Sequence, residues 1–448
     1  MPLFHRRDLH ETEERSDDPF CNPENPVKIT FEEITSAAYK IRSGIKNTPC
    51  EFSHISQLTG MSIFLKKDFL QHTGSFKERG ARYALLKLSD EEKSRGVIAA
   101  SLGNHAQAVC YHGHQLGIPV TVVMPLIAPI MKIQKCREYH ANVVIEGKDM
   151  AEAKQVAFKI SKERGLIYIN GYDHPHIIAG QGTIALEILE QVPDIDAIVV
   201  PTGGGGLLAG VSVAVKMLNP SVKVIGVESE RCASYSQAMA NGGPTFTPIE
   251  GTLADGLAVP EVGYNAWETS RNLLDKLVVV KEEYIALAIL RFIENEKCVV
   301  EGAGACGLAA ILSGQLEEFR GKRLVLILSG GNIDTTILGR CLERGLAADG
   351  RLVKCRVTVS DRPGGICELC KMVSSIGVSI KDIVHERAWV ASDVFSVEVI
   401  VVCETRDYTH SVQLRELLQS KYKKFEFENF PNEQSLVAPF TQDLFSMP

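Results

Sequence analysis

The sequence predicts an α/β protein with two parallel-sheet α/β subdomains, followed by a C-terminal α+β domain. Between about residues 50 and 345, short runs of Val and Ile alternate with helical stretches. Unbroken apolar strands separated by helices are typical of buried parallel sheets. From Leu352 the expected order changes to β-α-β-β-α, with KFEFENF at 424–430 as a further strand. At 448 residues the chain is longer than most single domains, so two or three folding units are expected.

The composition excludes two classes of protein and indicates a compartment. The net charge of -7 and the pI near 6.0 argue against a nucleic-acid binder, which would carry a basic surplus. No window is long and apolar enough to cross a membrane. The 12 cysteines are scattered through a chain without a secretory signal, so we expect reduced thiols in a cytoplasmic protein.

The first elements follow from local signals. Residues 1–26 are polar and mixed in charge, and we expect them to form a disordered tail. Residues 29–45 carry apolar side chains at helical spacing, with Thr30 as a candidate N-cap, so they predict a helix. Asn47-Thr48-Pro49 ends that helix.

Strands and helices then alternate to residue 332. The first unit is a strand at 96–101, a helix from Gly103 to about Gly117, and a strand at 119–125. Further strands are expected within residues 141–147, 166–171, 196–206, 222–229, 276–289 and 322–332. In folds of this kind, ligands bind beyond the carboxyl ends of the strands, where the connecting loops gather.

Three glycine- or serine-rich segments lie at such strand ends. They are Ser101–His105 (SLGNH), Thr202–Leu207 (TGGGGL) and Ser329–Asn332 (SGGN). Four consecutive glycines are costly in conformational entropy, and one or two would suffice for a tight turn. Four are expected where backbone N-H groups must approach an anion closely at the start of a helix, so this loop predicts a phosphate cup. It has neither the Walker nor the GxGxxG spacing of nucleotide sites.

Lys77, in QHTGSFKERGA, is open to two interpretations when read alone. It is either one more surface charge beside Glu78 and Arg79 or a reactive amine. A phosphate cup without a nucleotide fingerprint favours the reactive amine, because pyridoxal phosphate needs a lysine as well as a phosphate anchor. Asn104 is then a candidate donor to the ring oxygen of this cofactor, and Ser329 a candidate partner of its pyridine nitrogen.

Four motifs in order then carry a resemblance over residues 30–345. They are Ser75-Phe76-Lys77-x-Arg79-Gly80-Ala81, Ser101-x-Gly103-Asn104-His105, the tetraglycine loop and Ser329-Gly330-Gly331-Asn332. Together they resemble the threonine and serine dehydratases, which belong to the tryptophan-synthase-like group of pyridoxal-phosphate enzymes (fold type II).

This resemblance implies a catalytic domain over 27–346, with a small mobile subdomain at about 96–172. It implies that Lys77 carries the cofactor in a Schiff base and removes the Cα proton, and that Phe76 lies against the ring. The implied cofactor-binding residues are Phe76, Lys77, Asn104, Gly203, Gly204, Gly205, Gly206, Leu207 and Ser329. The implied substrate-carboxylate residues are Ser101, Gly103, Asn104 and His105. Residues 252–256 and 301–304 resemble further loops that line the cofactor.

The activity implied is a threonine ammonia-lyase. It would convert L-threonine and L-serine to 2-oxobutanoate and pyruvate with release of ammonia. Serine racemases share nearly all these motifs, but they have a second serine where this chain has Leu102, which cannot donate a proton. A catalytically inactive amino-acid sensor is the other alternative.

A metal site is a separate question that the resemblance raises. The racemases bind a divalent cation near a Gly-Val-Glu loop, and residues 226–230 resemble that loop. Glu228 is therefore left open as a cation ligand, while Ser234 stands where an aspartate is expected.

The C-terminal unit resembles an ACT domain, with Asp361-Arg362-Pro363-Gly364 as its strongest match. We expect a linker at 347–351, this domain at 352–430 and a tail at 431–448. The resemblance implies an amino-acid or nucleotide effector and a homo-oligomer, either a dimer or a tetramer. A purely structural dimerisation module is the alternative.

Overall fold

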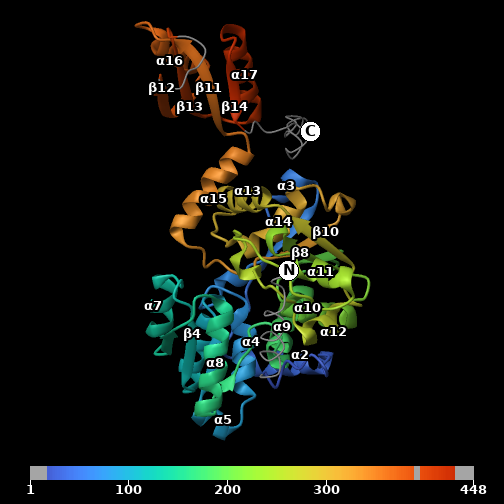
Figure 1. Cartoon of the computed structure of the whole chain (residues 1–448). Helices are drawn as coiled ribbons and strands as arrows, with labels where there is room; N and C mark the ends of the chain where they lie inside the picture. Colours follow the sequence, from blue (N-terminus) through green and yellow to red (C-terminus); the bar gives the residue numbers. More distant parts are fainter. Residues whose placement is uncertain (1–17, 388–393, 429–448) are drawn as a thin grey trace, which may run out of the picture.

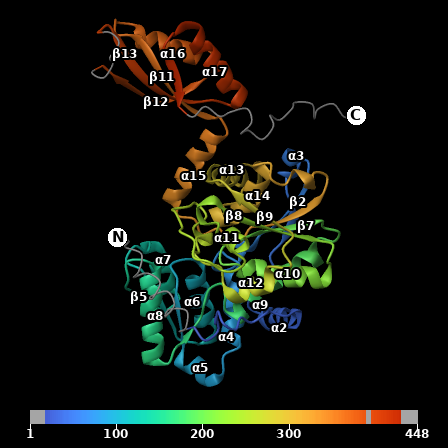
Figure 2. The same cartoon turned by 45° about the vertical axis from the view of Figure 1, so that its right-hand side comes forward.

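The computed structural model describes residues 18–387 and 394–428 of the chain. They form a large α/β part, a smaller α/β part beside it, and a C-terminal sheet domain at the far end of helix α15 (Thr335–Ala348) (Figure 1). The view in Figure 2 shows the same separation of the C-terminal domain from the rest.

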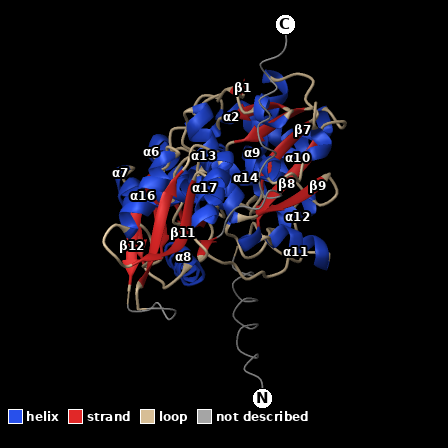
Figure 3. Ribbon diagram, turned by 90° about the horizontal axis from the view of Figure 1, so that it is seen from above, coloured by secondary structure: helices blue, strands red, loops and turns tan. Residues whose placement is uncertain are grey.

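The large part is built on a six-stranded sheet of order β1-β2-β10-β7-β8-β9. Only β1 is antiparallel to its neighbour, and the other pairs are parallel. The strands are β1 (Cys50–Phe52), β2 (Ser62–Lys66), β7 (Ala197–Pro201), β8 (Lys223–Ser229), β9 (Lys276–Val280) and β10 (Arg323–Ile327). Figure 3 shows β7, β8 and β9 running together with α10 (Gly206–Leu218) and α12 (Tyr264–Ser270) beside them.

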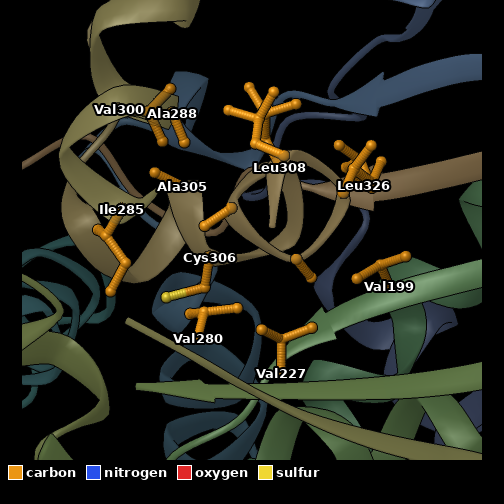
Figure 4. Close-up of a cluster of buried hydrophobic side chains, with 14 of the residues drawn as sticks. Val199, Val227, Val280, Ile285, Ala288, Val300, Ala305, Cys306, Leu308 and Leu326 are labelled. Carbon is orange, nitrogen blue, oxygen red and sulfur yellow. The ribbon is translucent and has the colours of Figure 1, made fainter. Parts of the chain in front are cut away.

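Helices cover both faces of this sheet, which explains its unbroken apolar strands. Val199, Val227 and Leu326 pack on one face against α14 (Gly302–Leu312), as Figure 4 shows. Ile198, Val224 and Val325 belong to the core on the other face. The remaining helices of this part are α2 (Phe31–Ile41), α3 (Ser56–Thr59), α4 (Lys77–Leu86), α9 (Pro175–Gln191), α11 (Ser234–Asn241) and α13 (Glu282–Arg291), with a π-helix at Phe292–Glu296.

The smaller part has a parallel four-stranded sheet of order β5-β4-β3-β6. Its strands are β3 (Val97–Ala100), β4 (Val120–Met124), β5 (Asn142–Ile145) and β6 (Ile167–Tyr168). Its helices are α5 (Asp90–Arg95), α6 (Asn104–Leu116), α7 (Ile130–Glu138) and α8 (Met150–Arg164). The helix expected from Gly103 to about Gly117 is α6. In both sheets the carboxyl ends of the strands carry the three glycine- or serine-rich loops.

The expected disordered tail is wrong for residues 18–26. Asp18 is buried, and its carboxylate accepts a hydrogen bond from the side chain of Asn170 at 3.5 Å. The Phe20 ring lies 4.4 Å from that of His174, and the Phe20 carbonyl accepts from Asn265 at 2.8 Å. These partners lie far along the chain, so local composition could not reveal them. Residues 1–17 lie outside the described part. The first helix is also shorter than expected, since α2 covers Phe31–Ile41 with Thr30 as its N-cap.

The C-terminal domain is an antiparallel sheet of order β12-β13-β11-β14 with helices against one face. Its elements are β11 (Leu352–Ser360), α16 (Gly365–Ser375), β12 (Ser379–Glu386), β13 (Ser396–Glu404), α17 (Tyr408–Lys421) and β14 (Phe425–Glu428). The expected β-α-β-β-α order with a final strand is confirmed. The structure shortens the expected linker, because α15 continues to Ala348. The tail expected at 431–448 lies outside the described residues.

No helix in the part of the chain that the structure describes is long and apolar enough to cross a membrane.

Candidate active site

The lysine motif and the SGGN loop pair with each other through their backbones. Phe76 N-H donates to the Ser329 carbonyl at 2.9 Å, and Gly331 N-H donates to the Gly74 carbonyl at 3.0 Å. Ser329 follows β10 and is buried. Two segments more than 250 positions apart are thereby held side by side, with Lys77 at the first position of α4.

The Lys77 amine lies at the junction of the two α/β parts. Its Nζ donates to the carbonyl of Gly171, just beyond β6, at 2.6 Å, and it lies 5.3 Å from the centre of the Phe76 ring. Burial lowers the pKa of Lys77 to about 8, because the charged form loses its hydration, while the Glu301 carboxylate opposes that shift. Gly171 is a contact that sequence reasoning missed, although its place after a parallel strand was a signal.

Asn104 is held by two side chains at the start of α6. Its Nδ2 donates to Glu301 Oε1 at 2.7 Å, and its Oδ1 accepts from Asn332 Nδ2 at 2.9 Å. Asn332 also donates to the Thr73 carbonyl at 2.7 Å. The Asn104 amide therefore has a defined orientation and keeps a second N-H free of these contacts. The roles of Glu301 and Asn332 as partners of Asn104 were not predicted from the sequence.

The tetraglycine loop is a close-packed turn between β7 and α10. A Cβ on Gly204 would collide with the ring of Tyr172, and one on Gly203 would lie 2.9 Å from Leu257. Gly205 has φ +89, a conformation that side chains disfavour, and Gly206 begins α10 with Leu207 after it. The loop thus leads into a helix start without room for side chains, which lets an anion approach its backbone N-H groups closely.

The Ser101–His105 loop follows β3 and adjoins Lys77. The Ser101 hydroxyl accepts from Gly103 N-H at 3.3 Å. The Nε2 of His105 contacts the Ile169 carbonyl at 2.9 Å, whereas its buried Nδ1 has no hydrogen-bond partner in the described structure. Burial lowers the pKa of His105 to about 3, and Lys77 adds to that shift, so its ring is neutral and Nδ1 is an available acceptor. Leu102 packs against the core of the smaller part.

Glu228 has a structural role rather than a ligand's geometry. Its carboxylate accepts from Tyr235 N-H at 2.6 Å and from the Ser236 N-H and hydroxyl at 2.9 and 2.7 Å. These bonds satisfy the first turn of α11. Burial raises the pKa of Glu228 to about 7. Across the described residues, no group of three or more His, Cys, Asp or Glu side chains is placed to hold a metal ion. The structure offers no support for a cation at Glu228.

Comparison with known proteins is consistent with this geometry. A family model described as pyridoxal-phosphate dependent enzyme matches residues 41–330. The chain belongs to this family. It is 41% identical over 394 residues to the L-threonine ammonia-lyase of Thermotoga maritima, an alignment that covers 88% of this chain and 98% of that protein.

Solved structures of family members have the same fold. Maize serine racemase is 34% identical with a TM-score of 0.68, over 72% of this chain and 99% of that one. The processed form of threonine deaminase isoform 2 from Solanum lycopersicum is also 34% identical, with a TM-score of 0.66 over 71% and 90%. The expected fold type II architecture is confirmed.

The residues present fit the pyridoxal phosphate that the family uses. Three features are those that this group requires: an amine with a lowered pKa at Lys77, an oriented amide at Asn104, and a side-chain-free anion cradle at 203–206. Two buried hydroxyls nearby, those of Thr73 and Ser75, have no hydrogen-bond partner in the described structure. These features lie in or beside loops that follow strands of the two sheets, and the backbone bonds of Ser329 and Gly331 hold the lysine motif beside the SGGN loop.

Proposed function

We propose that this enzyme is an L-threonine ammonia-lyase that also acts on L-serine. It converts them to 2-oxobutanoate and pyruvate and releases ammonia. The single observation that carries the proposal is the Lys77 amine, at the meeting point of the two parallel sheets, with a pKa near 8. The name of the Thermotoga maritima relative supports the choice of substrate.

Each residue of the site has a proposed task. Bound pyridoxal phosphate would supply the electron sink that makes the Cα proton of an amino acid acidic. Lys77 removes that proton, because its lowered pKa leaves about a tenth of the amine neutral at pH 7. Gly203–Leu207 would hold the phosphate, and Phe76 would lie against the cofactor ring.

Asn104 would donate to the ring oxygen of the cofactor through its remaining N-H, and Ser329 would be the partner of the pyridine nitrogen. The Ser101–His105 loop binds the substrate carboxylate through Ser101, Gly103, Asn104 and His105. His105 contributes its backbone N-H, because its ring Nδ1 is an acceptor and its Nε2 is bound to Ile169. Closure of the small subdomain at 96–172 excludes water from the site.

Leu102 favours elimination over racemisation. A racemase needs a proton donor on the face of Cα opposite the lysine, and an aliphatic side chain cannot supply one. Leu102 is partly buried and packs on the apolar core of the smaller part. Serine racemase is the second candidate function, because this chain shares its fold with maize serine racemase.

The test measures 2-oxo acid release from L-threonine and L-serine by the purified protein with added pyridoxal phosphate, beside Lys77→Ala. We expect 2-oxobutanoate and pyruvate from the wild type and neither from the variant. D-Serine formation, read by chiral chromatography, would instead support the racemase. Loss of both products, with a cofactor still bound, would favour an amino-acid sensor.

The C-terminal domain is proposed to be regulatory and to join copies of the chain. Its strand β12 is an edge of the sheet and exposes Ile383 and Val384 at 39% and 47%. An exposed apolar edge strand is a ready site for pairing with a second copy. Light scattering of the Ile383→Glu variant tests this assembly. We expect the variant to have a lower mass than the wild type, which should be a dimer or a tetramer. We also propose that an effector, either an amino acid or a nucleotide, binds near Asp361. The protein is further proposed to be cytoplasmic.

A further inference from the structure

Glu78 is a fully buried carboxylate immediately after Lys77. It occupies the one position of the lysine motif that the resemblance leaves open. Its Oε1 accepts a short hydrogen bond from Thr73 N-H, and its Oε2 lies 3.1 Å from His112 Nε2. A buried carboxylate is retained only where its oxygens are satisfied, so these two contacts define what Glu78 does.

His112 is held in one tautomer by its other neighbour. Its Nδ1 lies 3.3 Å from a guanidinium nitrogen of Arg82, and a guanidinium can only donate. Nδ1 is therefore the acceptor, and Nε2 carries the hydrogen that is donated to Glu78. Burial lowers the pKa of His112, although Glu78 opposes that shift, so the ring is neutral near pH 7. The chain of bonds runs from Arg82 through His112 to Glu78.

Thr73 connects this chain to the candidate active site. Its N-H is bound by Glu78, and its carbonyl accepts from Asn332 Nδ2 at 2.7 Å. The same Asn332 nitrogen donates to Asn104 at 2.9 Å. The residue four positions before Lys77 is thus fixed on one side by Glu78 and on the other by the partner of Asn104.

The start and the middle of α6 take part in this arrangement. The helix begins at Asn104 and carries His112 two turns later, so Glu78 holds its middle while Asn332 and Glu301 hold its start. Apolar residues of α4, among them Ala81 and Leu85, pack against α6 in the same core. The bonds of His112 to Glu78 and to Arg82 are polar contacts between these two helices.

We propose that Glu78 is a positioning residue, which fixes the Thr73–Phe76 loop, and with it Lys77, relative to the helix that begins with Asn104. The proposal rests on the proposed function and deepens it. It predicts an effect on chemistry that a purely stabilising role would not have, because misplacing a catalytic group by about 1 Å can cost about 100-fold in rate.

The main variant is Glu78→Gln, which keeps the volume but replaces one accepting oxygen with an N-H₂ donor. It can then accept from Thr73 or from His112, but not from both. We expect kcat for L-threonine to fall by about tenfold or more while KM changes less than about threefold. The dissociation constant for pyridoxal phosphate, measured by equilibrium dialysis of the cofactor-free protein, rises by about fivefold or more.

His112→Asn and the double variant complete a cycle. If the two residues act as one unit, the double variant loses no more kcat than the worse single variant, within about twofold. The control is Asp275→Asn. Its carboxylate likewise accepts a backbone bond, from Val224 N-H at 2.8 Å, but it lies at the far edge of the large sheet. We expect it to lose folding stability and to keep both kcat and cofactor affinity.

The outcomes separate the proposals. A Glu78→Gln variant that loses as much stability as Asp275→Asn, yet keeps kcat and cofactor affinity within about twofold, overturns the positioning role. If Glu78→Gln does not fold, His112→Asn decides by the same criteria. If the wild type releases no 2-oxo acid, the proposed function fails, while the change in cofactor affinity still tests Glu78.

Discussion

The side chains of Asn104 and Glu301 form a hydrogen bond of 2.7 Å between residues 197 positions apart. It joins the first residue of α6, in the smaller α/β part, to the residue before α14, in the large one. Burial raises the pKa of Glu301 to about 7, and the charge of Asp255 adds to that shift. The contact therefore links the orientation of Asn104 to a carboxyl group that titrates near neutral pH.

Glu301 makes the stability of the cofactor-free protein depend on pH. Between its ordinary pKa near 4.5 and its folded pKa near 7, the folded state holds a proton that the unfolded state has released. Stability is thus fully present below about pH 4.5 and falls as pH rises, by about 1.4 kcal/mol per unit. Urea unfolding should show Glu301→Gln gaining on the order of 2–3 kcal/mol relative to the wild type from about pH 5 to pH 8. A pH-independent difference would contradict the raised pKa.

Lys77 should react with amine reagents at a lower pH than solvent-exposed lysines. We expect half-maximal acetylation of the cofactor-free protein near pH 8, because burial of the amine favours its neutral form. Peptide mass spectrometry over a pH series measures this midpoint. In Glu301→Gln the midpoint should fall further, since the carboxylate that favours the charged amine is gone. A midpoint at the ordinary lysine value of 10.5 would refute the assignment.

Arg79 stabilises a buried ionic cluster two residues beyond Lys77. Its guanidinium donates to Asp68 at 2.8 Å and to Glu187 at 2.6 and 2.8 Å, while Lys66 pairs with Glu187 at 2.6 Å. Arg79→Met leaves the fully buried Asp68 without its cation, so we expect a loss of about 3–5 kcal/mol in urea unfolding.

Two further variants make this test specific to the buried cluster. Arg79→Met combined with Asp68→Leu should recover part of the stability, because it removes the uncompensated charge. Arg320→Met, in an exposed pair with Glu317, should cost less than about 1 kcal/mol. Equal losses for the buried and the exposed arginine would show that the cluster is unimportant.

Gly204 should not tolerate a side chain. In Gly204→Ala the new methyl group meets the ring of Tyr172, whose backbone N-H is held by Asn170 at 3.0 Å. We expect pyridoxal-phosphate affinity, measured by equilibrium dialysis, to fall by about tenfold or more because the cradle must shift.

The control is Gly339→Ala. Gly339 lies within helix α15, and a Cβ there would meet nothing within 4 Å. This variant should bind the cofactor normally and gain about 0.5–1 kcal/mol of stability. An unaffected cofactor affinity in Gly204→Ala would count against the loop as the phosphate site.

The sequence by itself determined the layered architecture and the chemical parts of the site. Its unbroken Val and Ile strands can be stable only under helices on both faces, and parallel strands then gather their following loops at one edge. Asn104, the glycines at 203–206 and Ser329 could be named for this reason, since each lies in such a loop. Lys77 could be named because a phosphate cup for pyridoxal phosphate also requires a lysine.

Only the tertiary structure decided which distant groups hold those parts in place. These groups are distant hydrogen-bond partners. Asn104 is held by Glu301 and Asn332, and Lys77 by the backbone carbonyl of Gly171. Glu78 in turn holds Thr73 and His112. The contacts of Asp18 and Phe20 are another, because their partners, Asn170 and Asn265, lie more than 140 positions away. Local periodicity reports how a segment pairs with its neighbours in sequence, whereas a buried polar group is specified by whichever distant donor or acceptor satisfies it.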